Sequence, residues 1–230
     1  MEKSMFLDLY QAQKVFFRSG KTHDISFRIE TLKKLKNLIS KREKEILAAV
    51  YADLHKDDID AYATELSGVY HEIKIAIASV RDWAAREKVL TPIIMYPAKS
   101  YIYKEPYGVT LIIAPWNYPF QLLMMPLIGS IAAGNTAILK PSEISAHTAA
   151  VLEKMINNAF PMEYIHVVQG AAPETQALLE LPVDYIFFTG SVPVGKAVMA
   201  AAAKNLTPLT LELGGKSPAI IHETAHLETA

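Results

Sequence analysis

The sequence predicts an α/β fold in which N-terminal helices and a β-ribbon arm precede a doubly wound parallel sheet. Three observations lead to this prediction. Apolar residues recur at helical spacing through the first part of the chain. An extended stretch follows, and after Gly108 apolar runs alternate with helical patterns. Because these runs are almost unbroken, both faces of the sheet must be covered, which is typical of parallel sheets.

Residues 1–90 form the predicted helical part. Asp24 is placed to cap a helix, because an aspartate side chain accepts hydrogen bonds from free backbone N–H groups. The apolar positions of that helix are Ile29, Leu32, Leu35 and Ile39. A later helix is expected between residues 63 and 88, with an apolar face of Leu66, Val69, Ile73 and Ile77.

Residues 91–107 are predicted to form the β-ribbon arm. Pro92 ends the helical pattern, because proline lacks a backbone N–H and disfavours a helical residue before it. Tyr101 and Tyr103 then alternate with Ile102 and Lys104, which is the period of a strand.

Residues 108–212 carry the predicted sheet. The strand patterns are VTLIIA, TAILK, YIHVVQG, DYIFFTG and LTPLTLELGG. The helix patterns between them are PFQLLMMPLIGSIAAG, SAHTAAVLEKMINNAF, PETQALLEL and VPVGKAVMAAAAKN. A last strand is predicted in PAIIH, within residues 213–230. Ligands bind at the carboxyl ends of the strands in such a sheet. Function is therefore expected in the loops APWN, LKPSE, FFTGS and LELGG.

The composition excludes several classes of function. Of 230 residues, 51% are hydrophobic and 20% are charged, and the formal net charge is −1. Without a basic excess, no nucleic-acid partner is expected. The chain contains no cysteine, which excludes disulfides and cysteine metal ligands, and no metal site is expected. It begins without an apolar signal core and has no apolar run of membrane-spanning length, so that a cytoplasmic protein without a membrane partner is predicted.

Asn117 stands in the APWN loop, between an apolar strand and an apolar helix. One interpretation is structural, because Pro119 suits the first position of a helix and an asparagine just upstream can cap it. The other is catalytic, because a neutral amide donor can stabilise a developing oxyanion. The spacing alone favours the cap.

The FFTGSVPVGKAV segment joins a strand that ends at Gly190 to a helix that begins near Val192. Free N–H groups at a helix start favour a phosphate, and glycine lets a ligand approach the backbone. The segment nearly matches a P-loop, but Ala197 stands where Ser or Thr must hold magnesium. A nucleoside triphosphatase is therefore disfavoured, and a tight turn that serves packing stays open as the alternative.

Two further strand ends carry ionisable side chains. Glu212 lies between Leu211 and Leu213. A carboxylate in apolar surroundings is costly unless it has a partner or takes up a proton more readily, and a general base is one use of such a group, but a glutamate at a strand end can also lean into solvent. Lys140 and Glu143 in LKPSE could hold ribose hydroxyls, although this segment alone is more typical of a helix start.

The HETAH segment, from His222 to His226, matches the H-E-x-x-H zinc pattern. That chemistry needs both histidines on one helix face and a third ligand. Here His222 ends a predicted strand, and four residues follow His226. We interpret the match as a coincidence.

Three segments in this order resemble the aldehyde dehydrogenase family: EPYGVTLIIAPWNYPF, GSIAAGNTAILKPSE and DYIFFTGSVPVGKAVMAAAAKNLTPLTLELGGKSP. The likeness is greatest to its class 3 branch, which handles medium-chain, fatty and aromatic aldehydes. It implies that residues 91–107 are an oligomerisation arm, that residues 108–212 are a Rossmann-like NAD(P)-binding domain, and that a catalytic domain starts in residues 213–230. By resemblance, Asn117 donates its amide to the oxyanion and Glu212 activates water. The implied cofactor-binding residues are Trp116, Lys140, Glu143, Gly190, Ser191, Val192, Pro193, Val194 and Gly195.

The resemblance also implies chemistry that this chain cannot complete. The family oxidises aldehydes to carboxylic acids with NAD or NADP through a cysteine thioester, and a full-length relative of this branch is expected to be a homodimer. The nucleophile follows the LELGG glutamate, but this chain stops at Ala230 and holds no cysteine. We therefore expect an inactive fragment. The alternative is a non-catalytic nucleotide-binding or interaction module that pairs through residues 93–107.

Overall fold

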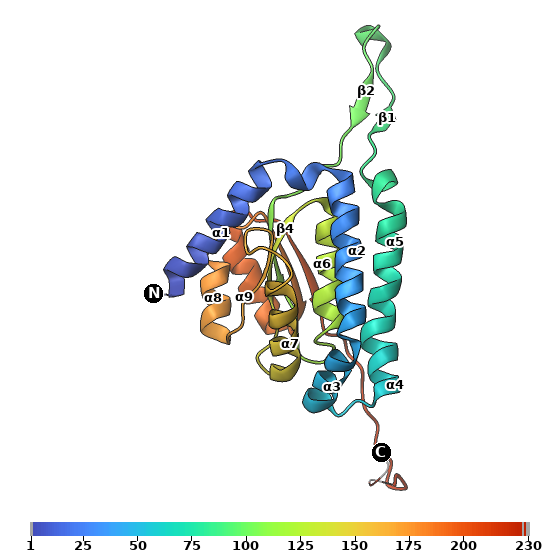
Figure 1. The fold of residues 1–230 in the computed structure, drawn as a ribbon, viewed down its shortest axis with the longest axis vertical. Coiled ribbons are helices and arrows are strands. Elements are labelled where there is room, and N and C mark those ends of the chain that lie inside the picture. The colour runs from blue at the N-terminus through green and yellow to red at the C-terminus, as the bar shows by residue number, and fades with distance from the viewer. Residues whose placement is uncertain (1, 227, 229–230) are drawn as a thin grey trace.

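The computed structural model describes residues 2–226 and 228, and its N-terminal part is helical (Figure 1). The helices are α1 (Glu2–Arg18), α2 (Ile25–Lys41), α3 (Glu43–Leu54), α4 (Asp58–Ala61) and α5 (Ser67–Trp83), with a 3-10 turn η1 (Lys21–His23) and a π-helical turn η2 (Tyr62–Leu66). The predicted cap of α2 is confirmed, because the Asp24 carboxylate accepts a hydrogen bond from the Ser26 N–H at 2.8 Å. The predicted core positions Leu32, Leu35 and Ile39 are buried.

Within the described residues, five strands form a parallel sheet in the order β5-β4-β3-β6-β7. They are β3 (Val109–Ile113), β4 (Thr136–Lys140), β5 (Ile165–Val167), β6 (Tyr185–Gly190) and β7 (Leu209–Leu213). The chain moves outward from β3 to β5, returns to place β6 beside β3, and moves outward again to β7. The predicted doubly wound sheet is thus confirmed, and its topological switch point lies between β3 and β6.

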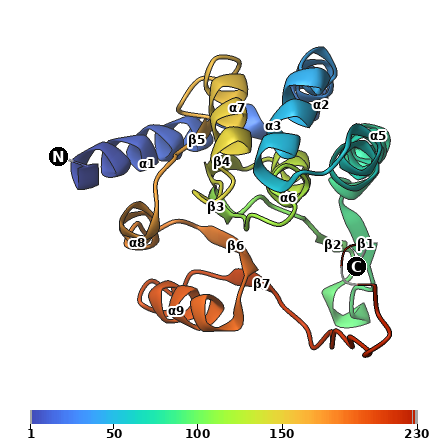
Figure 2. The ribbon, with the colours of Figure 1, turned by 90° about the horizontal axis from the view of Figure 1, so that it is seen from below.

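Helices cover both faces of the sheet (Figure 2). On one face lie α6 (Gln121–Ala133) and α7 (Ala146–Asn157), and on the other lie α1, α8 (Ala172–Leu179) and α9 (Val192–Ala203). α2, α3 and α5 pack on the outer side of α6 and α7, so that this face carries two helical layers. The strand side chains alternate between two apolar cores, with Ile112 and Leu139 in the first and Leu111 and Ile138 in the second.

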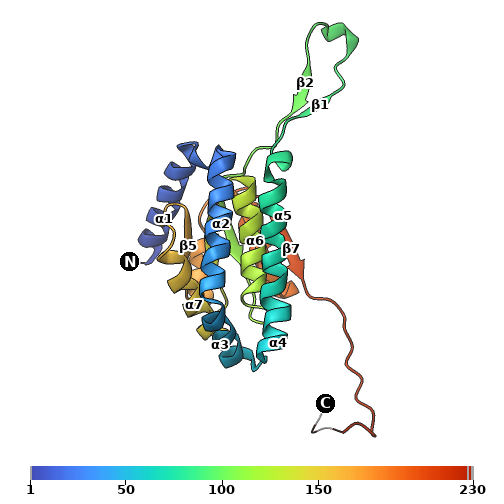
Figure 3. The same ribbon diagram turned by 45° about the vertical axis from the view of Figure 1, so that its right-hand side comes forward.

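A two-stranded antiparallel ribbon projects away from the helices and the sheet (Figure 3). Its strands are β1 (Glu87–Val89) and β2 (Ser100–Ile102), with a 3-10 turn η3 (Ile93–Met95) between them. The predicted ribbon arm is confirmed, although its first strand begins before Pro92. Several large apolar side chains of the arm are exposed, namely Leu90, Ile93, Ile94 and Tyr96.

The prediction of a strand in PAIIH is wrong. Residues 214–222 are irregular and run away from the sheet (Figure 3), and Ile220 and Ile221 are 90% and 72% exposed. A strand needs a neighbouring strand to satisfy its backbone hydrogen bonds. In the described part of the chain, no strand lies beside this segment.

Candidate functional site

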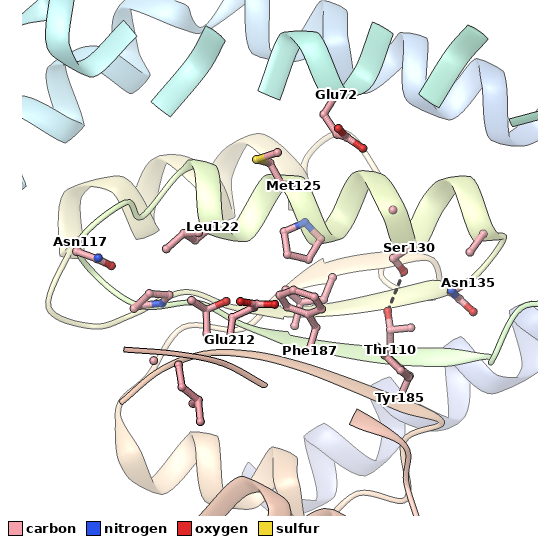
Figure 4. Close-up of a pocket in the computed structure, with 18 of the residues that line it drawn as sticks. Glu72, Thr110, Asn117, Leu122, Met125, Ser130, Asn135, Tyr185, Phe187 and Glu212 are labelled. Atoms are coloured by element: carbon pink, nitrogen blue, oxygen red, sulfur yellow. Dashed lines mark hydrogen bonds between the residues drawn. The ribbon is translucent and has the colours of Figure 1, made fainter. Parts of the chain in front are cut away.

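A groove of about 1080 Å³ runs along one face of the sheet at its switch point, from Asn117 and Glu212 near the carboxyl ends of the strands to Asn135 and Tyr185 near their amino ends (Figure 4). Parallel α/β sheets bind ligands at the carboxyl ends of their strands. The groove brings together five of the residues predicted for the site, namely Trp116, Asn117, Gly190, Ser191 and Glu212. Among the described residues, the other predicted ones lie outside the groove lining, namely Lys140, Glu143, Val192, Pro193, Val194 and Gly195.

The groove is lined largely by apolar side chains. Ile112 of β3 and Phe187 of β6 form the side made by the sheet, and Met125 of α6 lines the side made by the helix. Glu72 of α5 reaches the groove above Met125 (Figure 4). An apolar cleft with a few polar groups is typical of a small-molecule site.

Asn117 lies in the loop between β3 and α6, with its side chain exposed. α6 begins at Gln121, and the N–H groups of Phe120 and Gln121 donate to the Glu65 carboxylate at 3.2 and 3.0 Å. The cap is therefore Glu65, not Asn117 as the spacing favoured. Among the residues that the structure describes, the Asn117 side chain has no hydrogen-bond partner, so its amide is available to a ligand in the groove.

Glu212 lies in β7, the outer strand of the sheet, opposite Thr189 of β6. Its side chain is exposed and lines the groove near Phe187 (Figure 4). The sequence left open whether this carboxylate lies in apolar surroundings or leans into solvent, and in the structure it is exposed to solvent. At this position the carboxylate is within reach of water in the groove, which is the geometric requirement for a general base.

α9 begins directly after β6, with Ser191 as its N-cap residue. Within residues 2–226 and 228 the Ser191 side chain makes no capping hydrogen bond, so that free backbone donors and the positive end of the helix dipole face outward. Gly195 lets the helix lie close to β7, because a Cβ atom there would be 2.7 Å from Leu213 Cδ2. The exposed residues of this helix start are Ser191, Val192, Pro193 and Val194.

Lys140 ends β4, and its side chain is buried although it carries an amine. Nζ donates to the carbonyl oxygen of Pro141 at 2.7 Å. Burial lowers the pKa of this amine, while the charges of Glu143 and Glu174 act in the opposite direction. An ammonium group has three donors, and in the described part of the chain only one of them is used. Glu143 follows in an exposed loop.

Two residues that the sequence pattern did not single out hold the Asn117 loop. Glu65 is fully buried, and Lys56 Nζ lies 3.0 Å from Glu65 Oε1 and 3.2 Å from the backbone oxygen of Asn117. The sequence contains one signal for Glu65, because it stands four residues before Val69 and eight before Ile73, on the buried face of a helix. It contains no comparable signal for Lys56.

Asp53 of α3 holds the start of α7 in the same manner. Its carboxylate accepts hydrogen bonds from the backbone N–H groups of His147 and Thr148 at 3.1 and 2.7 Å. Burial acts to raise the pKa of Asp53, but the hydrogen bonds from Thr148 and His147 outweigh it, and the pKa lies below its ordinary value of 3.8.

Among residues 2–226 and 228, no three His, Asp or Glu side chains are arranged to hold a metal ion. His222 and His226 lie in an irregular segment with a turn rather than on one helix. Over the same residues, no helix combines the length and the apolar character needed to cross a bilayer.

Comparison with known sequences gives a consistent set of matches. A sequence profile of the aldehyde dehydrogenase family matches residues 8–230. The chain is 54% identical over 217 residues to 4,4'-diaponeurosporen-aldehyde dehydrogenase of Staphylococcus aureus, an alignment that covers 94% of this chain and 47% of that protein. It is 44% identical over 214 residues to aldehyde dehydrogenase family 3 member A2 of Mus musculus, with 93% and 44% covered. The chain thus spans about half the length of the curated relatives it matches.

Solved structures match the fold. The substrate-bound form of Staphylococcus aureus AldH aligns with a TM-score of 0.90 at 53% identity, over 96% of this chain and 48% of that one. A betaine aldehyde dehydrogenase from Staphylococcus aureus in complex with NAD⁺ aligns with a TM-score of 0.83 at 29% identity, over 98% and 45%.

Proposed function

The chain belongs to the aldehyde dehydrogenase family, and we propose that its groove binds a nicotinamide dinucleotide, NAD or NADP, for aldehyde oxidation by a protein of the relatives' full length. One observation carries the proposal. The Asn117 amide, the Glu212 carboxylate and Ser191 at the uncapped start of α9 line one groove at the switch point of the sheet. A dinucleotide lies across this crevice in doubly wound proteins.

The start of α9 suits the diphosphate of the cofactor. A helix start with free N–H groups attracts a phosphate, and no side-chain cap occupies this one among the described residues. We assign the contacts around the diphosphate to Gly190, Ser191, Val192, Pro193, Val194 and Gly195. Trp116, which is 48% exposed and lines the groove, is assigned to the same cofactor.

Lys140 and Glu143 suit the adenosine ribose. A buried amine whose only hydrogen bond within the described residues goes to Pro141 retains donors for ribose hydroxyls. Glu143 can accept from such hydroxyls, and its charge disfavours a 2′-phosphate. We therefore expect NAD to bind at least as well as NADP.

Asn117 and Glu212 are the proposed catalytic residues. When bound, the nicotinamide would accept the hydride from the aldehyde carbon. The Asn117 amide donates to the aldehyde oxygen as negative charge develops there, a role in which a carboxylate would repel the charge. Glu212 would take the proton of the water that attacks the thioester carbonyl, and the thiolate of the family's cysteine, which these 230 residues do not contain, would leave as the carboxylic acid forms.

The apolar groove supports an apolar substrate. Ile112, Phe187 and Met125 would contact hydrocarbon rather than hydroxyl groups. We propose a medium-chain, fatty or aromatic aldehyde. The exposed apolar side chains of the arm support a homodimer for a protein of full length. The cytoplasmic location stays a prediction.

The family's thiol chemistry is beyond this chain by itself. Its 230 residues contain no cysteine, so no acyl-enzyme can form on it by that route. We propose that the isolated chain binds the nucleotide without turning it over.

Titration calorimetry of the chain with NAD⁺ and with NADP⁺ tests the proposal. We expect uptake of at least one of them at one site per chain. Lys140→Met should weaken that binding about tenfold to hundredfold, because a hydrogen bond from a charged donor contributes about 1.5–3 kcal/mol. Lys204→Met, an exposed lysine at the other end of α9, is the matched control.

Uptake of neither nucleotide would overturn the proposed function. Magnesium-dependent ATP hydrolysis would instead favour the P-loop alternative. Formation of reduced nucleotide from a long-chain aldehyde by the 230-residue chain would contradict its expected inactivity.

A further inference from the structure

The geometry points to Lys56 and Glu65 as positioning residues that fix the Asn117 loop over the groove, a role that rests on the proposed function of Asn117. Neither side chain lines the groove. They act from the N-terminal helical layer, through the backbone oxygen of Asn117 and the residues that follow it.

Glu65 fixes the C-terminal side of the loop. Its Oε2 accepts hydrogen bonds from the N–H groups of Phe120 and Gln121, at 3.2 and 3.0 Å, across 55 and 56 residues of sequence. The carboxylate is fully buried, so that water cannot replace these hydrogen bonds. The first turn of α6 is therefore fixed relative to η2, the turn that precedes α5.

Lys56 fixes Asn117 itself. Nζ donates to the backbone oxygen of Asn117 at 3.2 Å, bonds Glu65 Oε1 at 3.0 Å, and lies 3.9 Å from the centre of the Tyr118 ring. A cation over an aromatic ring is attracted to it, so two consecutive residues of the loop contact the same ammonium group. The backbone of Asn117 is therefore held at its carbonyl oxygen, while its side-chain amide makes no hydrogen bond within the described residues.

The two residues do more than stabilise α6. Glu65 accepts from the N–H groups of Phe120 and Gln121 at the start of that helix, and the bond from Lys56 to the Asn117 oxygen adds nothing to this cap. A glutamine at position 65 has an amide oxygen that could still accept from both N–H groups of α6, but its NH2 group, a donor, could not hold the Lys56 ammonium group. The charged pair therefore links the helix start and the loop into one unit.

Backbone ¹⁵N relaxation of the chain, recorded without nucleotide, tests this role. In the native protein we expect order parameters of about 0.85 for Asn117 and Tyr118, the value of rigid backbone. In Lys56→Met they should fall below about 0.6, the range of flexible segments. Lys56→Arg keeps the charge and should restore most of the order.

The chain offers a matched control. Lys34 donates to the backbone oxygen of Ala159 and lies 4.7 Å from the centre of the Phe160 ring, the same two kinds of contact at a site away from the groove. Lys34→Met should leave the order of the Asn117 loop unchanged. Glu65→Gln, which keeps one acceptor for α6 and loses the ion pair, should loosen the loop in the same way as Lys56→Met.

The test separates this role from the function on which it rests. A loop that stays rigid in folded Lys56→Met and Glu65→Gln would overturn the positioning role and leave nucleotide binding untouched. A chain that takes up no nicotinamide nucleotide, but whose loop loosens in both variants, would keep the mechanical link and overturn the proposed function.

Discussion

The helices that follow β3 and β4 begin differently from the helix that follows β6. A carboxylate from the N-terminal helices occupies the start of each of the first two, Glu65 at α6 and Asp53 at α7. At the start of α9 no side chain takes this place among the residues described. All three helix starts offer the same unpaired N–H groups and the same dipole. The difference shows two uses of a helix start. Its N–H groups can bind a carboxylate of the same chain and so fix the preceding loop, or they can stay unpaired and bind an anionic ligand.

The layers of the fold explain which helix start is filled. α3 and α5 pack against α7 and α6 and bring acids within reach, whereas α9 packs on β6, β7 and α8. The loops that carry Asn117 and Glu143 thus precede filled helix starts. Of the three, the proposed diphosphate site is the helix start without such a layer.

Glu65→Ala should have the largest effect, a loss of about 3–5 kcal/mol in the free energy of unfolding. The substitution removes one partner of a buried ion pair and leaves two backbone N–H groups of α6 without an acceptor. Urea denaturation followed by circular dichroism measures the loss. Ser191→Ala is the matched change at the start of α9 and should lie within about 0.5 kcal/mol of the native chain. Equal losses in the two variants would show that the starts of α6 and α9 do not differ in how they are held.

Asp53→Asn should cost about 1–2 kcal/mol at neutral pH, the usual contribution of a helix cap. The pKa of Asp53 is lowered in the folded protein because hydrogen bonds from His147 and Thr148 outweigh the effect of burial. The stabilisation by the ionised group is therefore complete above the unfolded pKa, and it is lost as the pH falls through the lower folded value.

The difference in unfolding free energy between the native chain and Asp53→Asn should thus shrink below about pH 4. Urea denaturation at each pH measures it. A difference that did not shrink down to about pH 2 would show that Asp53 is not held as a carboxylate at the start of α7.

Local patterns were enough to predict the sheet and the loops that meet at its switch point. The spacing of apolar residues that distinguishes a helix from a strand can be recognised within a short stretch of sequence. The Asp24 cap is likewise local, because Asp24 and Ser26 are two residues apart. The contact of Asp53 with Thr148 spans 95 residues, and that of Glu65 with Gln121 spans 56. Such contacts follow from how the layers pack, which no local pattern records.

The sequence also could not show which strand lies at the edge of the sheet, because strand order depends on contacts between distant segments. In LELGG, alternation places Glu212 on the face opposite Leu211, but only the strand order shows that β7 is an outer strand and that this face opens to the groove. PAIIH has the composition of a strand, and its strand-forming residues Ile220 and Ile221 lack a neighbouring strand in the described part of the chain. A strand depends on its partner as much as on its own residues.

Ser191→Asp should convert the open helix start into a filled one. A carboxylate at this position should stabilise the chain by about 0.5–1 kcal/mol, because it interacts favourably with the helix dipole. The same charge should weaken binding of NAD⁺ about tenfold by repelling the diphosphate, and the loss should shrink as salt is raised. Urea denaturation measures the gain in stability. Titration calorimetry with NAD⁺ at two ionic strengths measures the weaker binding and its dependence on salt.

Ala200→Asp is the control for this variant, because it adds the same charge to an exposed position within α9. It should leave nucleotide binding within about twofold, since it lies away from the helix start. If both variants weakened binding equally, net charge and not the helix start would explain the effect.

Gly195→Ala should have the smallest effect, within about 0.5 kcal/mol in unfolding free energy. Alanine is favoured over glycine in a helix by about 0.8–1 kcal/mol, but the new methyl group would lie 2.7 Å from Leu213 Cδ2. Because Leu213 is 40% exposed, its side chain can move aside at a cost similar to the gain. Ala200→Gly in the same helix measures the propensity alone and should lose about 0.8–1 kcal/mol. If Gly195→Ala instead gained that full amount, the start of α9 would not be held against β7, and the position of the open helix start at the groove would lose its support.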